Sequence, residues 1–287
     1  MWGATDMTPP LVCPARLEKL LVCTDGSGDS EGAVAGALAL ARSCQSKIFL
    51  LQVLEFNPEL EAQAPQYVAE RENLIHGYLQ KHRREAEGLE IPVEVRVRRC
   101  EAAYQGIVEE AEKIHPDLIV MGRRGRSRFF RLLMGNVTAR VIGYSPYNVL
   151  VVPKGVPLDF SHLLIASDGS SYSDAAWEEA LSMTRRLGSR LTALSVAGSA
   201  EELEWARSIV ARLRTEARLQ DIPLDTLVLV GAPYVTNDGT ARTQGADLIV
   251  MGALGMTGLS SLIMGSVTER VIATAPCTVM VVKGAFR

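Results

Sequence analysis

The six residues DLIVMG occur twice in this chain, at 117–122 and at 247–252. The segments that start at the Met-Gly of each copy, MGRRGRSRFFRLLMGNVTARVI and MGALGMTGLSSLIMGSVTERVI, are identical at 11 of 22 positions. Upstream, LLVCTDGS at 20–27 matches LLIASDGS at 163–170. A single buried strand does not require one fixed string of apolar residues. The ordered matches therefore indicate a duplicated chain with two similar halves.

The spacing of the matches locates the difference between the halves. The offset is 143 residues for the upstream match and 130 for the downstream match, so the first half carries about 13 extra residues. We place them in or near 57–66, where two prolines predict an extended loop. We expect a loose tail at 1–15, one domain at 16–155 and a second at 156–287. A chain of 287 residues is long enough for two domains with separate cores.

Apolar segments alternate with amphipathic helical segments in both halves. The expected strands are 19–23, 48–54, 93–99, 117–122 and 148–152 in the first half, and 162–166, 190–196, 224–230, 247–252 and 278–282 in the second. Strands that are apolar on both faces predict a parallel sheet covered by helices on both sides. Ser30 and Ser173 are the expected N-caps of the first helix in each half. The segment at 237–239 (NDG) forms helix poorly, so we expect a short or irregular helix there.

The residues after each strand are the candidate binding residues, because ligands of such sheets bind at the carboxyl ends of the strands. After each DLIVM comes a glycine pattern, G-x2-G-x9-G followed by Asn136 in the first half and Ser266 in the second. Glycine allows the backbone to approach a ligand closely. A helix that starts at the last glycine would favour a phosphate at its N-terminus, with Asn136 or Ser266 as cap. A loop that serves only as a turn is the alternative.

DGS after the first strand, DLIVMG, and G-x2-G-x9-G-[S/N]-V-T-x-R-V-I before an apolar last strand together resemble the universal stress protein family. The resemblance covers 17–285 and identifies a tandem two-domain member. It implies two doubly wound five-stranded parallel α/β sheets with strand order 3-2-1-4-5 and helices on both faces. The apolar last strands would bury each other's edges by pairing across the halves, about a pseudo-twofold axis.

The resemblance also implies an adenine nucleotide, ATP or AMP, or a mode that is independent of ATP. Mg²⁺ would accompany ATP. The implied nucleotide-binding residues are Thr24, Asp25, Val53, Met121, Gly122, Arg123, Gly125, Arg126, Gly135, Asn136 and Val137 in the first half, and Ser167, Asp168, Val196, Met251, Gly252, Gly255, Gly265, Ser266 and Val267 in the second. Asp25 and Asp168 have a second interpretation, as turn residues that bond their own backbone.

The two glycine loops differ in charge. Arg123, Arg124 and Arg126 lie in the first loop, at the positions of Ala253, Leu254 and Met256 in the second. Only the first loop could offer a phosphate charge-assisted hydrogen bonds. A docking site for an acidic partner and a solvated loop are the alternatives.

Several other functions are disfavoured by the sequence. It contains no nucleophile–base–acid pattern and no Walker A motif, so we expect no dedicated enzyme and at most slow ATP hydrolysis. DGSGDS at 25–30 resembles the SGGxDS loop of PP-loop pyrophosphatases, but the second half has DGSSYS. A net charge of −3 argues against nucleic acid. No apolar run approaches the ~18 residues that span a membrane.

Five cysteines without a CxxC pair indicate a reduced, cytoplasmic protein, and the four histidines show no metal-binding spacing. We therefore expect a cytoplasmic stress-response protein that binds adenine nucleotide in one or both domains and thereby regulates a protein partner. A homodimer is left open. The alternative is a nucleotide-free interaction scaffold whose glycine loops are structural.

Overall fold

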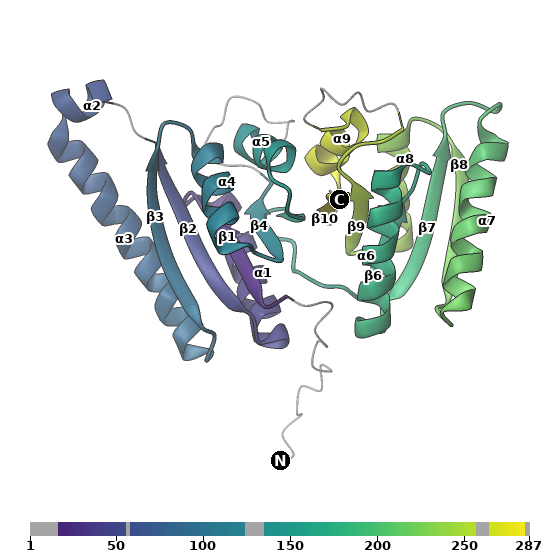
Figure 1. The fold of residues 1–287 in the computed structure, drawn as a ribbon, viewed down its shortest axis with the longest axis horizontal. Coiled ribbons are helices and arrows are strands. Elements are labelled where there is room, and N and C mark those ends of the chain that lie inside the picture. The colour runs from purple at the N-terminus through teal and green to yellow at the C-terminus, as the bar shows by residue number, and fades with distance from the viewer. Residues whose placement is uncertain (1–16, 56–57, 124–134, 257–263, 285–287) are drawn as a thin grey trace, which may run out of the picture.

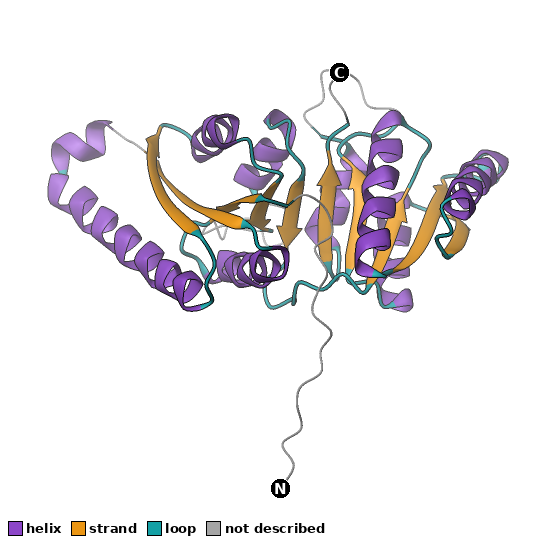
Figure 2. Ribbon diagram, turned by 60° about the horizontal axis from the view of Figure 1, so that its bottom comes forward, coloured by secondary structure: helices purple, strands orange, loops and turns teal. Residues whose placement is uncertain are grey.

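The computed structural model describes residues 17–55, 58–123, 135–256 and 264–284. Within these ranges, ten strands form one sheet in the order β3-β2-β1-β4-β5-β10-β9-β6-β7-β8 (Figures 1 and 2). The strands are β1 (Lys19–Cys23), β2 (Lys47–Glu55), β3 (Val93–Cys100), β4 (Leu118–Gly122), β5 (Val149–Val152), β6 (His162–Ala166), β7 (Arg190–Ala197), β8 (Leu224–Val230), β9 (Leu248–Gly252) and β10 (Thr278–Val282).

The predicted strand order 3-2-1-4-5 is confirmed in both halves. All pairs within a half are parallel, such as β1 with β4 and β6 with β9. The central strands are buried on both faces, which explains why their sequences are apolar without alternation. The carboxyl ends of β6, β7 and β9 therefore meet at one edge of the second half.

Helices cover both faces of the sheet (Figure 2). One face packs against α1, α3, α6 and α7, and the other against α4, α5, α8 and α9. The helices are α1 (Gly28–Cys44), α2 (Pro58–Gln63), α3 (Pro65–Gly88), α4 (Ala103–Ile114), α5 (Asn136–Tyr144), α6 (Ser171–Leu187), α7 (Leu203–Leu219), α8 (Pro233–Gln244) and α9 (Ser266–Thr274). The predicted doubly wound α/β fold is confirmed.

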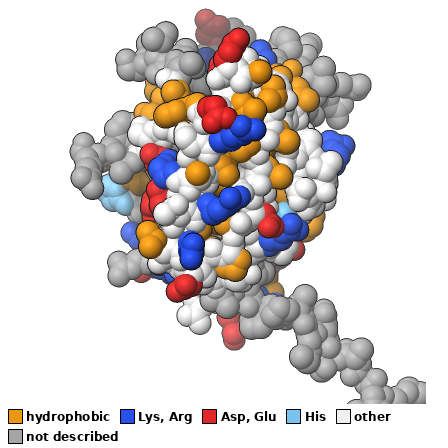
Figure 3. Space-filling model, turned by 90° about the vertical axis from the view of Figure 1, so that its right-hand side faces the viewer, with side chains coloured by type: hydrophobic (Ala, Val, Ile, Leu, Met, Phe, Trp, Pro, Cys, Tyr) orange, Lys and Arg blue, Asp and Glu red, His pale blue; other side chains and the backbone are white. Residues whose placement is uncertain are grey.

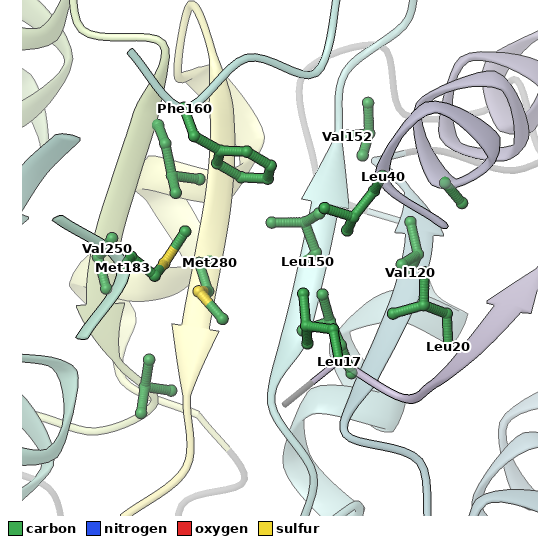
Figure 4. Packing of buried hydrophobic residues seen from close by; sticks show 14 of the residues in the cluster. Leu17, Leu20, Leu40, Val120, Leu150, Val152, Phe160, Met183, Val250 and Met280 are labelled. Atoms are coloured by element: carbon green, nitrogen blue, oxygen red, sulfur yellow. The ribbon is translucent and has the colours of Figure 1, made fainter. Parts of the chain in front are cut away.

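The two halves join through their last strands, as the apolar edges predict. β5 and β10 pair antiparallel, with Leu150 opposite Met280. These two residues occupy equivalent positions in the repeat, 130 residues apart. The pseudo-twofold axis therefore passes between them, as expected for a self-complementary interface. The side chains of Leu150 and Met280 belong to one apolar core that continues across this seam (Figure 4).

Polar groups add to the seam between β5 and β10. The backbone N–H of Lys283 donates to Asn148 Oδ1 at 3.0 Å, and its Nζ donates to the carbonyl of Ile142. Burial lowers the pKa of the Lys283 amine. Because the cation lies near the end of α5, it also interacts favourably with the partial negative charge of that helix terminus.

The extra residues of the first half are helical, and the predicted extended loop at 57–66 is wrong. They form α2 and lengthen α3 to 24 residues, compared with 17 in α7. Pro58 and Pro65 begin these helices, where a missing N–H costs nothing. The prolines mark helix starts and not an extended segment.

The expectation of a short or irregular helix around Asn237 is also wrong. α8 has 12 residues, as many as α4. Pro233 starts α8 and Gly245 ends it with a φ of 66°. Asp238 accepts a hydrogen bond from Thr274 of α9. Packing against α9 thus outweighs the weak local helix propensity.

The N-caps of α1 and α6 are Ser27 and Ser170, three residues earlier than the predicted caps. Ser170 Oγ accepts from the backbone N–H of Ser173 at 3.2 Å. Ser30 and Ser173, the predicted caps, are buried in the first turn and donate to the carbonyls of Ser27 and Ser170. The predicted caps are therefore wrong, because several serines lie close together and the sequence pattern does not distinguish the true cap.

The outer face of the second half, formed by α7 and β8, carries apolar side chains interspersed with Lys, Arg, Asp and Glu (Figure 3). Trp205 and Leu219 of α7 are 53% and 80% exposed. Among the described helices, none has an apolar stretch of the length and character that crossing a bilayer requires.

Candidate functional site

A pocket of about 190 Å³ lies at the carboxyl ends of β6, β7 and β9, between the starts of α8 and α9. It gathers all nine residues predicted for the second half: Ser167, Asp168, Val196, Met251, Gly252, Gly255, Gly265, Ser266 and Val267. The other lining residues are Ala166, Ser173, Leu194, Pro233, Asn237, Leu254 and Thr268. Residues up to 102 positions apart in the chain, from Ala166 to Thr268, thus line one cavity.

The two ends of this pocket differ chemically. One end, between β7 and α8, is lined by Leu194, Val196 and Pro233 and is mostly apolar. The other end is formed by the glycine loop and the first turn of α9. A ligand with a flat apolar part and an anionic part matches this division.

The first turn of α9 presents backbone N–H groups to the pocket. Its N-cap is Gly265, with φ −69° and ψ 141°, so the predicted cap Ser266 is instead the first helical residue. The same correction applies to Asn136, because Gly135 caps α5. The first backbone hydrogen bond of α9 runs from Glu269 N to Gly265 O at 3.0 Å. The N–H groups before Glu269 are the ones that a helix leaves for an anion.

A threonine fixes each of these helix starts to the preceding strand. Thr268 Oγ1 donates to the carbonyl of Gly252 at 3.0 Å, and Thr138 Oγ1 donates to that of Gly122 at 3.1 Å. Sequence reasoning missed both threonines. The V-T dipeptide, which comes shortly after the last glycine of the G-x2-G-x9-G pattern in each half, is the sequence feature that could have identified them.

Gly252 and Gly122 are required for helix packing. A Cβ at Gly252 would lie 2.7 Å from the carbonyl carbon of Tyr172 in α6. A Cβ at Gly122 would lie 2.7 Å from the carbonyl oxygen of Asp29 in α1. Side chains are excluded at both positions because the helix backbone occupies the space. This packing alone accounts for the glycine in each DLIVMG.

Asp168 holds the glycine loop of the second half. Its Oδ1 accepts from Ser170 N at 3.0 Å, and its Oδ2 accepts from Met256 N at 2.8 Å. A Cβ at Gly255 would lie 2.6 Å from Oδ2, so glycine is needed for this contact. The turn interpretation of Asp168 is therefore present in the structure, together with a position in the pocket wall.

The described residues of the first half repeat part of this arrangement. Asp25 Oδ1 accepts from Ser27 N at 3.0 Å, as in the second half. Met121 is buried and belongs to one apolar cluster with Val53 and Val137. The buried hydroxyl of Thr24 lies 2.9 Å from Ser30 Oγ and donates to Tyr78 OH at 3.2 Å. Thr24 thus joins β1 to α1 and α3.

Arg123 extends across the seam between the halves. Its Nη1 donates to the carbonyl of Ala275, at the end of α9, at 2.8 Å. The predicted phosphate contact would compete with this hydrogen bond. Gly125, Arg126 and the remaining arginines of the first loop, Arg124, Arg128 and Arg131, lie outside the described residues.

Asn237 of α8 is a pocket residue that sequence reasoning did not assign to the site. It is 3% exposed, and its Oδ1 has no hydrogen-bond partner among the residues that the structure describes. The equivalent residue of the first half, 130 positions earlier, is Ile107. A comparison of the two halves could have identified this residue, because a polar side chain replaces an apolar one at this position.

No group of three or more His, Cys, Asp or Glu side chains in the described parts of the chain is arranged to hold a metal ion. Burial raises the pKa of the thiols of Cys23 and Cys277, the latter to about 12. These two cysteines are therefore protonated at neutral pH and do not supply thiolates.

The family model described as "Universal stress protein family" matches residues 16–153 and again 159–283. A universal stress protein of Mycolicibacterium smegmatis is 26% identical over 292 residues, which cover 92% of this chain and 96% of that protein. One from Methanocaldococcus jannaschii is 30% identical over 140 residues, or 43% of this chain and 82% of the relative. Both the tandem arrangement and the single domain thus have relatives.

Solved structures support the fold over nearly the whole chain. A universal stress protein from Archaeoglobus fulgidus covers 94% of this chain and 100% of its own, with a TM-score of 0.73 at 23% identity. A functionally unknown protein from Pseudomonas aeruginosa covers 94% of this chain and 93% of its own, with a TM-score of 0.66 at 19% identity. At these identities the likeness concerns the fold alone.

Proposed function

The chain belongs to the universal stress protein family, and on this premise we propose that its second half binds an adenine nucleotide, ATP or AMP. The observation that carries the proposal is the single pocket that contains all nine predicted residues of that half. The protein would act in the cytoplasm as a stress-response switch, in which nucleotide occupancy changes the binding of a regulatory partner.

The chemistry of the pocket suggests the orientation of the ligand. The base would pack between Val196 and Pro233 at the apolar end. The phosphates would accept hydrogen bonds from the N–H groups of Ser266 and Val267, where the α9 dipole is positive. Each oxygen of Asp168 accepts one backbone hydrogen bond and has a second lone pair for a ribose hydroxyl.

The charge of the pocket limits the function. No Lys or Arg is among the described residues that line it, so the phosphates would depend on backbone N–H groups and on Mg²⁺ carried with ATP. Asp168, the only acid in that lining, already accepts two backbone N–H groups and is poorly placed to activate water. We therefore propose binding with at most slow hydrolysis.

A nucleotide-free scaffold is the second candidate, and specific contacts favour it. Helix packing explains Gly252, and the contact with Asp168 explains Gly255, without any ligand. The two candidates differ in one respect: only nucleotide binding requires the space in front of Gly265 to stay open.

Gly265 is the position that separates these candidates. Its backbone is extended, and a Cβ there would meet its nearest neighbour, Ala253 O, at an ordinary 3.5 Å. Gly265→Leu would therefore fill the pocket mouth without backbone strain. Gly135→Leu is the matched change, because Gly135 caps α5 with the same kind of backbone.

The test is to denature the purified protein, identify released nucleotide by chromatography, and measure the melting temperature with added Mg–ATP. We expect ATP or AMP, or a rise in melting temperature, in the wild type and in Gly135→Leu, and neither in Gly265→Leu. If the wild type releases no nucleotide and millimolar Mg–ATP leaves its melting temperature unchanged, the scaffold is the better account.

A further inference from the structure

We propose that Asn237 makes the second-half pocket selective for a base that carries a hydrogen-bond donor at its edge, the exocyclic amino group of adenine. The inference rests on the proposed nucleotide function and adds a specificity residue to it. It rests on the side-chain oxygen of Asn237, which has no hydrogen-bond partner among the described residues.

The position of Asn237 sets it apart from other polar residues of α8. Its side chain is 3% exposed and lines the pocket, and Oδ1 has no partner among the described residues. Asp238 accepts from Thr274 of α9 through Oδ2, although its Oδ1 is also unpaired among the described residues, and Thr236 Oγ1 donates to Ala232 O at 3.1 Å. Unlike Asn237, neither residue lines the pocket. Buried polar atoms are nearly always paired, so the unpaired oxygen of a side chain that lines a pocket is a candidate to accept a hydrogen bond from a ligand.

The location within the pocket indicates which part of the ligand is recognised. Asn237 lies one helical turn after Pro233, at the mostly apolar end formed with Leu194 and Val196. The N–H groups for the phosphates are at the opposite end, in the first turn of α9. A nucleotide in this orientation places its base, and not its phosphates, against the carboxamide.

A carboxamide matches the edge of adenine. Its oxygen accepts from the amino group at C6, while its nitrogen donates to an adjacent ring nitrogen, the pairing that Asn forms with adenine in DNA. Guanine and hypoxanthine have an oxygen at C6, which would face the carboxamide oxygen and repel it. A purine with only hydrogen at C6 leaves the buried oxygen unpaired.

The first half has no polar side chain at the position equivalent to Asn237. Ile107, at the equivalent position of α4, is 5% exposed and offers no hydrogen bond. A Cβ on the adjacent Gly106 would lie 3.1 Å from Val53 Cγ1, so apolar groups surround this position. The substitution Asn237→Ile therefore gives the second half the residue that the same fold already accommodates in the first.

The experiment compares Mg–ATP with the Mg complex of purine riboside triphosphate, which lacks the amino group at C6. Tryptophan fluorescence reports the second half, because Trp177 lies in α6 and Trp205 Nε1 is 3.4 Å from Asp168 O. The third tryptophan, Trp2, precedes both halves in the sequence. Dissociation constants are measured for the wild type, Asn237→Ile and Val235→Ala, an exposed residue of α8 outside the pocket.

We expect the wild type and Val235→Ala to bind ATP about tenfold or more tightly than the analogue. In Asn237→Ile this ratio falls below about threefold, because ATP loses the hydrogen bond to the carboxamide oxygen, which the analogue never makes. If Asn237→Ile does not fold, the same ratio of dissociation constants is measured in Asn237→Ser, whose side chain is smaller and polar.

An unchanged ratio in the folded variant overturns the role of Asn237 and leaves nucleotide binding intact. A wild type that binds neither compound overturns the proposed function and this inference with it. The two failures are therefore distinguishable.

Discussion

The two halves of this protein share a backbone framework and differ in the side chains at their binding edges. Gly122 and Gly252 both allow a helix to pack on the strand end, and Thr138 and Thr268 both fix the next helix. By contrast, Asn237 stands where the first half has Ile107. Duplication thus retained the residues that shape the loop and most of the predicted binding residues, and altered a few side chains such as Asn237.

Arg123 shows the same divergence at the seam. It contributes a guanidinium to the end of α9, whereas its equivalent in the second half, Ala253, is buried and apolar. Arg123 therefore supports the junction of the halves, and the described part of the second loop lines the pocket. Four predictions test this comparison, from the largest expected effect to the smallest.

Met280→Pro should have the largest effect. Proline removes a ladder hydrogen bond in a buried strand, which should lower the free energy of unfolding by about 3 kcal/mol or more. Because the core continues across β5 and β10, hydrogen exchange should rise in β1 as well as in β6. Met280→Leu, which conserves volume, is the control. Faster exchange in the second half alone would show that the halves are stabilised independently.

Gly252→Val and Gly122→Val should destabilise the two halves alike. Each places a side chain 2.7 Å from a helix backbone, so we expect a loss of about 1–3 kcal/mol, measured by urea unfolding. Gly239→Ala is the control, because no atom lies within 4 Å of its added Cβ and alanine favours the helix. A neutral Gly252→Val would mean that this glycine serves a ligand and not packing.

Arg123→Ala should cost about 1 kcal/mol, from one charged hydrogen bond at a helix end. Nucleotide affinity of the second half should be unchanged. Arg83→Ala, which removes an exposed pair with Glu87, is the surface control and should be near neutral. If Arg123→Ala weakens nucleotide binding and leaves stability intact, the arginine contacts phosphate instead.

The smallest effect concerns acid stability. His162 bonds Gln244 O and Thr192 Oγ1, and burial together with the charge of Arg190 lowers its pKa. Because the folded-state pKa lies below the unfolded value of about 6.5, the contribution of His162 is complete above that pH and declines as pH falls below it. The equivalent residue in the first half is Lys19.

Urea unfolding at about pH 7 and about pH 5.5 measures this decline. The wild type should lose more free energy of unfolding than His162→Gln over that interval. Asp247, whose pKa is raised by burial and lowered by the charge of His162, is present in both proteins, so the difference reports the histidine together with its effect on Asp247. Equal losses would show that the imidazole does not contribute to acid sensitivity.

The features that the sequence predicted correctly depend on local residue patterns or on motifs that are repeated in both halves. Strand positions followed from runs such as LIVMG, and the pairing of β5 with β10 followed from two apolar edges. The contact of Arg123 with Ala275 depends on how the halves are placed, which no local pattern records. Asn237 looked like a poor helix former, and its burial arises from packing against distant elements.

The central claim is that the second-half pocket holds an adenine nucleotide against the first turn of α9. The most direct measurement is the backbone amide NMR spectrum during titration with Mg–ATP. We predict that the N–H resonances of Ser266, Val267 and Thr268 shift with one saturable affinity and that Gly265→Leu abolishes the shifts. Resonances that stay unchanged, or that shift only in the equivalent first turn of α5, would contradict it.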